Sequence, residues 1–159
     1  MKETDKERIG RVIARIPSGC GVLAAGTQES GLGMLASWFQ QCSFDPPMIT
    51  VAVKKGRPIE AILDDTRRFV LNLIGEDFAP MFRHFGKGFA PDERAFDGLA
   101  ARPDPHGVIL DDCIGYLSCE VVAKYPAGDH QVYVGEVVAG RLTDDARPYV
   151  HLRKNGLDY

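Results

Sequence analysis

The sequence lacks the features that would indicate a membrane or nucleic-acid function. No apolar run approaches the roughly 20 residues that a bilayer-spanning helix needs, and the first ten residues are charged where a signal peptide is apolar. Lys and Arg total 19 against 22 Asp and Glu, without a sustained basic block, so clustered cations for phosphate binding are missing. We therefore expect a cytoplasmic protein that binds neither membrane nor nucleic acid.

Cysteine is scarce. The four thiols show neither the C-x-x-C spacing of zinc or redox sites nor the density of small secreted scaffolds; they are Cys20, Cys42, Cys113 and Cys119. We expect buried, reduced thiols packed as small hydrophobic residues, and the alternative is a disulfide or metal-binding role. The length of 159 residues and the 45% hydrophobic composition suit a single domain over residues 1–159, which can bury a core without disulfide or metal staples.

The usual catalytic signatures are also absent. There is no G-x-S-x-G elbow, no P-loop, no H-E-x-x-H and no dinucleotide G-x-G-x-x-G after a strand. The histidines are too far apart for a local metal motif, although distant residues can converge in space; they are His84, His106, His130 and His151. The sequence thus gives no support to nucleophilic or metal-dependent hydrolysis.

Strand patterns dominate what is present. Apolar runs and period-2 alternation predict extended segments over 20–27, 34–44, 48–53, 69–74, 117–125, 130–142 and 149–152. Helical spacing predicts helices over 4–16, where Thr4 and Glu7 fit a capping box, and over 57–65 and 78–85. Many short strands, few helices and mostly short connections predict a mainly β fold, an antiparallel barrel with α-helical inserts.

One long segment, 86–107, is rich in Gly, Pro, Asp and Arg and is expected to be irregular. Loops of this length usually have a function. Because the segment carries Phe89, Phe96 and Leu99, we expect it to pack near the functional site or a dimer partner, although a surface Ω-type loop has the same composition.

Three clusters carry candidate chemistry. In the first, the small residues Ala36 and Ser37 would let a planar ligand approach the backbone, and an edge strand could hydrogen-bond its polar rim. The alternative is an ordinary barrel strand with Trp38 in the core.

The other two clusters are turns. Lys54-Lys55-Gly56-Arg57 combines an open backbone, a helix N-terminus and cations that can pair with phosphate, or it is a solvated charged turn. Gly128-Asp129-His130 begins a strand, and its alternative is a capping Asp beside a surface His.

Together these clusters resemble the flavin reductase-like family of FMN-binding split barrels. The resemblance runs from about residue 16 to 159 and consists of motifs in the family's order: Cys20-Gly21-Val22-Leu23, Ala36-Ser37-Trp38, Ser43-Phe44-Asp45-Pro46-Pro47-Met48, Gly128-Asp129-His130, Val134-Gly135-Glu136-Val137 and a closing segment over 148–156 with Tyr159. The chain is also similar to the reductase domains at the C-terminus of cyanobacterial diflavin proteins.

The resemblance implies a split barrel of antiparallel Greek-key type that forms a homodimer, binds FMN near the subunit interface and reduces it with NADH or NADPH. It implies isoalloxazine and ribityl contacts from Met34, Leu35, Ala36, Ser37, Gln41, Cys42 and Ser43. It also implies phosphate candidates at Lys54, Lys55 and Arg57, and a catalytic His130 close to the flavin and nicotinamide. Many members have Ser or Thr near positions 57 and 58, where this chain has Arg and Pro, so the phosphate ligands stay open.

Hydride transfer is intrinsic to nicotinamide and flavin, so the protein mainly has to stack, orient and tune the two rings, and needs no nucleophile. Reduced FMN would then serve a partner oxygenase, or a bound flavin would pass electrons to ferric iron, oxygen or another redox protein. The alternatives are a non-enzymatic FMN-binding electron-transfer module and a cofactor-free dimeric interaction domain.

Overall fold

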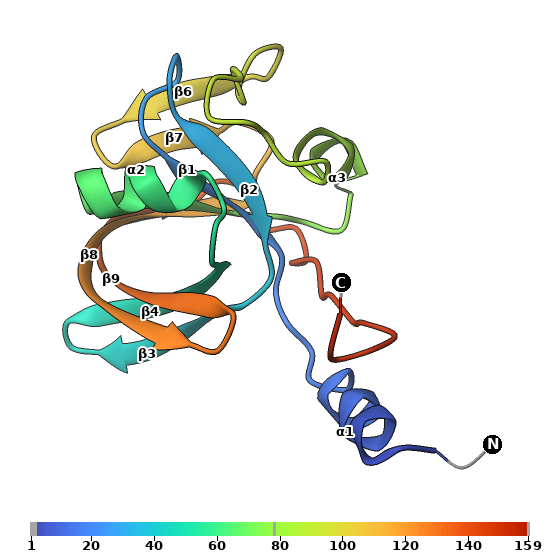
Figure 1. The fold of residues 1–159 in the computed structure, drawn as a ribbon. Helices are drawn as coiled ribbons and strands as arrows, with labels where there is room; N and C mark the ends of the chain where they lie inside the picture. Colours follow the sequence, from blue (N-terminus) through green and yellow to red (C-terminus); the bar gives the residue numbers. More distant parts are fainter. Residues whose placement is uncertain (1–2, 78, 159) are drawn as a thin grey trace.

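A strongly curved antiparallel sheet dominates the computed structural model, which describes residues 3–77 and 79–158 (Figure 1). Its strands lie in the order β2-β1-β5-β8-β9-β4-β3, with bounds β1 (Gly21–Ala25), β2 (Leu32–Ala36), β3 (Phe39–Phe44), β4 (Pro47–Lys54), β5 (Arg68–Leu73), β8 (Gly115–Ala127) and β9 (His130–Leu142). A separate hairpin joins β6 (Ala101–Asp104) and β7 (Gly107–Leu110). The helices are α1 (Asp5–Ile13), α2 (Ile59–Thr66) and α3 (Ala79–Phe85). The predicted mainly β fold with helical inserts is confirmed.

The long ribbon β8–β9 bends the sheet into a barrel. The first half of β8 pairs with β5, and the first half of β9 pairs with β4, so one ribbon joins both halves of the sheet. Register shifts at Ser118/Cys119 and Val121/Ala123 mark irregularities that sharpen the twist. At Gly135 a Cβ would lie 2.6 Å from the Phe69 ring, so glycine makes room for this buried aromatic side chain.

The core fills the inside of the curved sheet. Its largest fully buried side chains include Tyr133, Phe69, Phe85, Phe96, Leu23 and Leu63. Helix α2 contributes Ile59 and Leu63 on one face, as its apolar spacing predicts. Burial of one such side chain stabilises the fold by about 1.5–3 kcal/mol, so these two residues hold α2 against the sheet.

Several predicted boundaries change in the structure. The Thr4–Glu7 capping box is confirmed, but α1 ends at Ile13 rather than residue 16. The extended segment 34–44 is two strands at opposite edges of the sheet, because the chain crosses between them at 37–38. The third predicted helix began at Phe78, which lies outside the described residues. The predicted strand over 149–152 is wrong: a single isolated bridge, between Ser18 and His151, forms in this range.

The segment 86–107 is less irregular than its composition predicts. Its last part forms β6, which pairs with β7 from Ala101↔Leu110 to Asp104↔Gly107. Phe96 is buried in the core, and Phe89 and Leu99 pack against it. Pro103 is tolerated within β6 because this strand has a partner on one side only.

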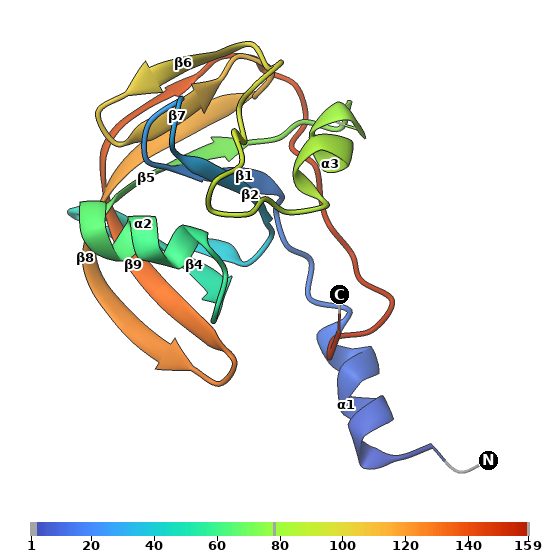
Figure 2. The same cartoon turned by 45° about the horizontal axis from the view of Figure 1, so that its top comes forward.

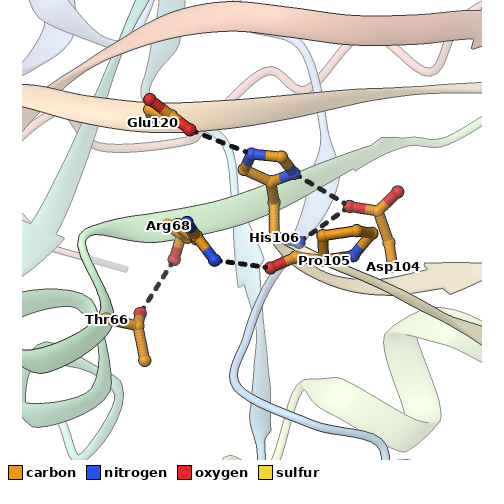
Figure 3. A network of polar contacts seen from close by, with 6 residues as sticks. All are labelled: Thr66, Arg68, Asp104, Pro105, His106 and Glu120. Carbon is orange, nitrogen blue, oxygen red and sulfur yellow. Dashed lines mark hydrogen bonds and ion pairs between the residues drawn. The ribbon is translucent and has the colours of Figure 1, made fainter.

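Polar contacts hold this hairpin to the barrel. The His106 ring lies between two carboxylates, with Nδ1 3.3 Å from Asp104 Oδ1 and Nε2 3.5 Å from Glu120 Oε1 (Figure 3). Buried Asn72 donates to the Val108 carbonyl at 3.0 Å and accepts from the Leu110 N–H at 2.9 Å. The hairpin lies at one end of the barrel, whereas α1 and the C-terminal segment project from the other (Figure 2).

Candidate functional site

The candidate site lies where the chain crosses from β2 to β3. The Trp38 ring centroid is 4.7 Å from that of His130, and the Arg153 guanidinium carbon lies 4.9 Å from the Trp38 ring. The Trp38 carbonyl accepts a hydrogen bond of 2.8 Å from the Ala52 N–H, which ties the crossing to β4. Three segments far apart in the sequence therefore meet at one indole.

A pocket of about 230 Å³ opens beside this crossing. It is lined by a mostly apolar set of residues: Cys20, Leu35, Ala36, Ser37, Phe82, His151 and Arg153. Small-molecule pockets usually measure about 300–1,000 Å³. This chain alone therefore encloses only part of a nucleotide-sized ligand.

Only part of the first predicted cluster lies in the pocket. Leu35, Ala36 and Ser37 line it, whereas Met34 packs partly buried against the core. The remaining predicted ring contacts lie on the edge strand β3, which runs away from the crossing and does not line this pocket; they are Gln41, Cys42 and Ser43. A register shift between Gln41 and Ser43 interrupts the pairing there.

The exposure of Cys42 corrects one prediction. All four cysteines are free, and three are buried as expected, but Cys42 is exposed because it lies at the irregularity of an edge strand. Cys20 is buried beside the pocket, and its desolvation raises the pKa of the thiol to about 11. A thiol of that kind is mostly protonated at neutral pH and serves as a packing group.

The two predicted turns form one unit. Lys54 pairs with His130 across the β4–β9 ladder, and the Lys55 N–H donates to the Asp129 carbonyl at 3.0 Å. The Lys55 ammonium donates to the Gly128 carbonyl at 2.5 Å, so this cation holds the neighbouring turn. The structure thus brings together two clusters that lie more than seventy residues apart.

The phosphate candidates differ in their surroundings. The Gly56 N–H donates to a Glu60 carboxylate oxygen at 2.5 Å, so a phosphate on this backbone group would have to displace that carboxylate. Arg57 is exposed and reaches the segment 86–107, where a Cβ on Gly88 would lie 3.8 Å from its Nη1. All three cationic residues are exposed, and the Lys55 ammonium is engaged at the Gly128 carbonyl.

His130 is buried rather than on the surface, with 5% of its area exposed. Its Nδ1 donates to Asp129 Oδ1 at 2.7 Å. That hydrogen bond is the main reason why the pKa of the Asp129 carboxyl lies below its ordinary value. Asp129 fixes the imidazole while the ring itself packs against Trp38.

The sequence interpretation missed the contribution of the closing segment. His151 and Arg153 line the pocket, and both belong to the closing segment 148–156. The sequence motifs indicate no role in the site for this segment. Phe82, from α3, was likewise not predicted. The signal in the sequence that could have indicated a role for the closing segment is its combination of aromatic and cationic residues.

Metal-binding groups and membrane-spanning helices were both sought among the described residues. Within residues 3–77 and 79–158, no group of three or more His, Cys, Asp or Glu side chains could hold a metal ion. Over the same residues, none of the helices has the length and apolar character needed to cross a bilayer.

Comparisons with known proteins agree with this architecture. The NADH:FAD oxidoreductase SgcE6 of Streptomyces globisporus C-1027 superposes with a TM-score of 0.84 over 94% of this chain and 92% of its own, at 22% identity. A likeness at that identity shows the fold, the split barrel of flavin reductases. The family description "Flavin reductase like domain" matches residues 13–156, and the chain belongs to this family.

Relatives with higher identity are longer proteins. The putative diflavin flavoprotein A 3 of Nostoc sp. is 38% identical over 154 residues, covering 95% of this chain and 27% of that protein. Diflavin flavoprotein A 1 of Synechocystis sp. is 36% identical over 162 residues, covering 100% of this chain and 28% of that protein. The chain spans just over a quarter of these curated relatives.

Proposed function

We propose that the chain is an NAD(P)H-dependent flavin reductase that transfers hydride from a nicotinamide to FMN. The observation that carries the proposal is the convergence of the pocket at 35–37 with Trp38, His130 and Arg153 at one end of the barrel. Membership of the flavin reductase-like family supports an oxidoreductase rather than a cofactor-free interaction domain.

The residues present fit an isoalloxazine ring. Ala36 and Ser37 leave the backbone accessible to a flat ligand, and Leu35 and Phe82 supply apolar contact. A bound flavin would supply the hydride-accepting chemistry.

The chain itself would contribute position and electrostatics. Ser37 and the backbone at 36–37 would hold the flavin, and Phe82 would exclude water from the pocket. His130, held at Nδ1 by Asp129 and packed on the Trp38 ring, would place a polar imidazole beside the crossing.

FMN is proposed over FAD on the resemblance to FMN-binding split barrels, whereas the Streptomyces neighbour is named for NADH and FAD.

The proposal includes a homodimer. The small pocket needs a second wall, and apolar side chains on the β8–β9 ribbon are exposed, among them Tyr125 at 60% and Leu142 at 66%. Light scattering with FMN present checks this: a monomer throughout the micromolar range contradicts it.

The alternative is a non-enzymatic FMN-binding electron-transfer module. It is supported by relatives named diflavin flavoproteins, in which the matching region is only about a quarter of the protein. For either function, we propose that the electrons pass from the flavin to an oxygenase or another redox protein.

One assay separates these functions. The purified chain is titrated with FMN, FAD and riboflavin, and the oxidation of NADH and of NADPH is then followed with and without each flavin. Multiple turnovers that depend on added or bound FMN support the reductase. FMN binding without turnover supports the electron-transfer module, and failure to bind any flavin at micromolar concentration contradicts both.

The phosphate site has its own test. The double variant Lys54→Ala with Arg57→Ala should weaken FMN far more than riboflavin, because only FMN carries the phosphate. Equal loss of affinity for both flavins would show that this turn does not hold the phosphate.

A further inference from the structure

Arg153 differs from the other arginines of the chain. It is partly buried, whereas every other arginine is exposed. Its guanidinium packs on the Trp38 ring and lines the pocket beside Ala36 and Ser37. The sequence therefore places its least accessible guanidinium in the wall of the candidate site.

This guanidinium forms no ion pair with the residues that the structure describes. Within residues 3–77 and 79–158, no carboxylate lies within 4.0 Å of it, and its hydrogen bond there is from Nη1 to the Gly156 carbonyl at 3.4 Å. By contrast, Arg94 and Arg102 pair with Asp97 and Asp111 at the surface. Arginine stays charged at all relevant pH values, so partial burial without an anion has a desolvation cost that the indole offsets only in part.

The missing partner is most simply an anion carried by the ligand. The planar guanidinium presents several donors that match two oxygens of one phosphate. The turn at 54–57 does not compete for the same group, because it lies on the His130 side of the site and donates its Gly56 N–H to Glu60.

We propose that Arg153 binds a phosphate group of a nucleotide substrate at the pocket beside Trp38. The inference rests on the proposed function for the identity of the nucleotides, which are the flavin and the nicotinamide dinucleotide. Both carry phosphate esters, and the experiment distinguishes them.

The test uses three probes in calorimetric titrations of the intact chain. FMN and riboflavin differ only in the flavin phosphate, and ADP-ribose carries the diphosphate of the dinucleotide without its nicotinamide. The variant is Arg153→Gln, and the matched control is Lys154→Gln, which removes an exposed cation at the next position. Arg153→Lys keeps the charge without the planar fork, and serves also if the Gln variant does not fold by circular dichroism.

We expect Arg153→Gln to weaken one phosphate-bearing probe by about tenfold or more, in line with the loss of a charge-assisted hydrogen bond. If only the affinity for ADP-ribose falls, Arg153 binds the diphosphate of the nicotinamide dinucleotide. If the affinity for FMN falls and that for riboflavin does not, Arg153 binds the flavin phosphate. Arg153→Lys should lie between the Gln variant and the parent, and Lys154→Gln should stay within twofold of the parent.

Three results would overturn the proposal. They are unchanged affinity for all three probes, an equal loss for FMN and riboflavin, and failure of the parent chain to bind any probe. The proposed reductase activity can fail separately: a parent that binds phosphate through Arg153 but oxidises no NADH keeps the phosphate site and loses the reductase.

Discussion

The two ends of the barrel use similar side chains for different purposes. At the hairpin end, His106 lies between Asp104 and Glu120, and Arg68 donates to the Pro105 carbonyl at 3.5 Å (Figure 3). At the crossing end, His130 and Arg153 both pack against the indole of Trp38. At the hairpin end, histidine and arginine thus contact carboxylates and a carbonyl, whereas at the crossing end they pack against an aromatic ring.

Cavity size alone would not select the crossing, because hollows of about 500 and 460 Å³ lie elsewhere on the molecule. The hairpin end has an open hollow of about 460 Å³ lined by Thr27, Arg68 and His106, among others, twice the volume of the pocket at the crossing. Its polar side chains already bond to the protein, whereas the smaller pocket is largely apolar and holds Arg153 without a described carboxylate. What the charged groups face is therefore more informative about ligand binding than the volume.

The largest expected effect is the loss of the contacts that attach the β6–β7 hairpin to the barrel. Asn72→Ala removes an amide that bonds to the Val108 carbonyl and the Leu110 N–H, and leaves these buried groups unsatisfied. We expect a loss of about 3 kcal/mol in the free energy of unfolding, measured by urea denaturation.

The control for this variant is Gln28→Ala. Gln28 also donates to the hairpin, but over 3.5 Å to the Ala101 carbonyl, so its removal should change the stability by less than about 0.5 kcal/mol. Equal losses for the two variants would mean that Asn72 is not the main attachment of the hairpin.

The next effect concerns catalysis at the crossing end. His130→Ala should lower NAD(P)H-dependent flavin reduction by about tenfold or more, the low end of what one positioned polar group contributes, and should leave the FMN affinity within a few-fold of the parent. Steady-state rates and fluorescence titration measure the two quantities.

His106→Ala is the matched control at the other end, and it should retain the parent's turnover. Full turnover in the His130 variant would reduce that residue to a structural element of the turn. Comparable losses in both histidine variants would point to general destabilisation.

Local sequence signals predicted much of the barrel. The capping box of α1, the apolar face of α2 and the long strands β8 and β9 depend on spacing within one element, so they could be predicted. The strand β6 could not, because Pro103 and Pro105 suggest an irregular loop, and only pairing with β7 makes the segment extended.

The site was less predictable than the fold. Ala36 and Ser37 could be proposed as site residues because of their small size, and His130 because of its place in the Gly128-Asp129-His130 turn. The place of Arg153 depends on the return of the C-terminal segment to Trp38, a contact across more than a hundred residues that no local pattern encodes. The exposure of Cys42 likewise depends on an irregularity in strand pairing.

A smaller effect tests whether His106 stabilises the contact between the hairpin and the barrel. His106→Gln should lower the free energy of unfolding by about 1 kcal/mol, because the ring contributes contacts to Asp104 and Glu120 from a largely buried position. Glu120→Gln and the double variant complete a mutant cycle in urea denaturation. Additive losses would show that His106 and Glu120 do not interact.

The smallest effect is expected at Asp129, whose carboxylate is solvent-exposed although it accepts a hydrogen bond from His130. Because that bond lowers the pKa of Asp129 in the folded chain, the pair adds stability above the ordinary carboxyl pKa of about 3.9, and this stability is lost as the pH falls through the folded pKa. Asp129→Asn should therefore be slightly less stable than the parent at pH 7, and the gap should close below about pH 4. Urea midpoints at the two pH values measure it, with Asp65→Asn, an exposed carboxylate on α2, as the control. A gap that widens in acid would reverse the sign of the linkage and remove Asp129 as the group that fixes the His130 ring.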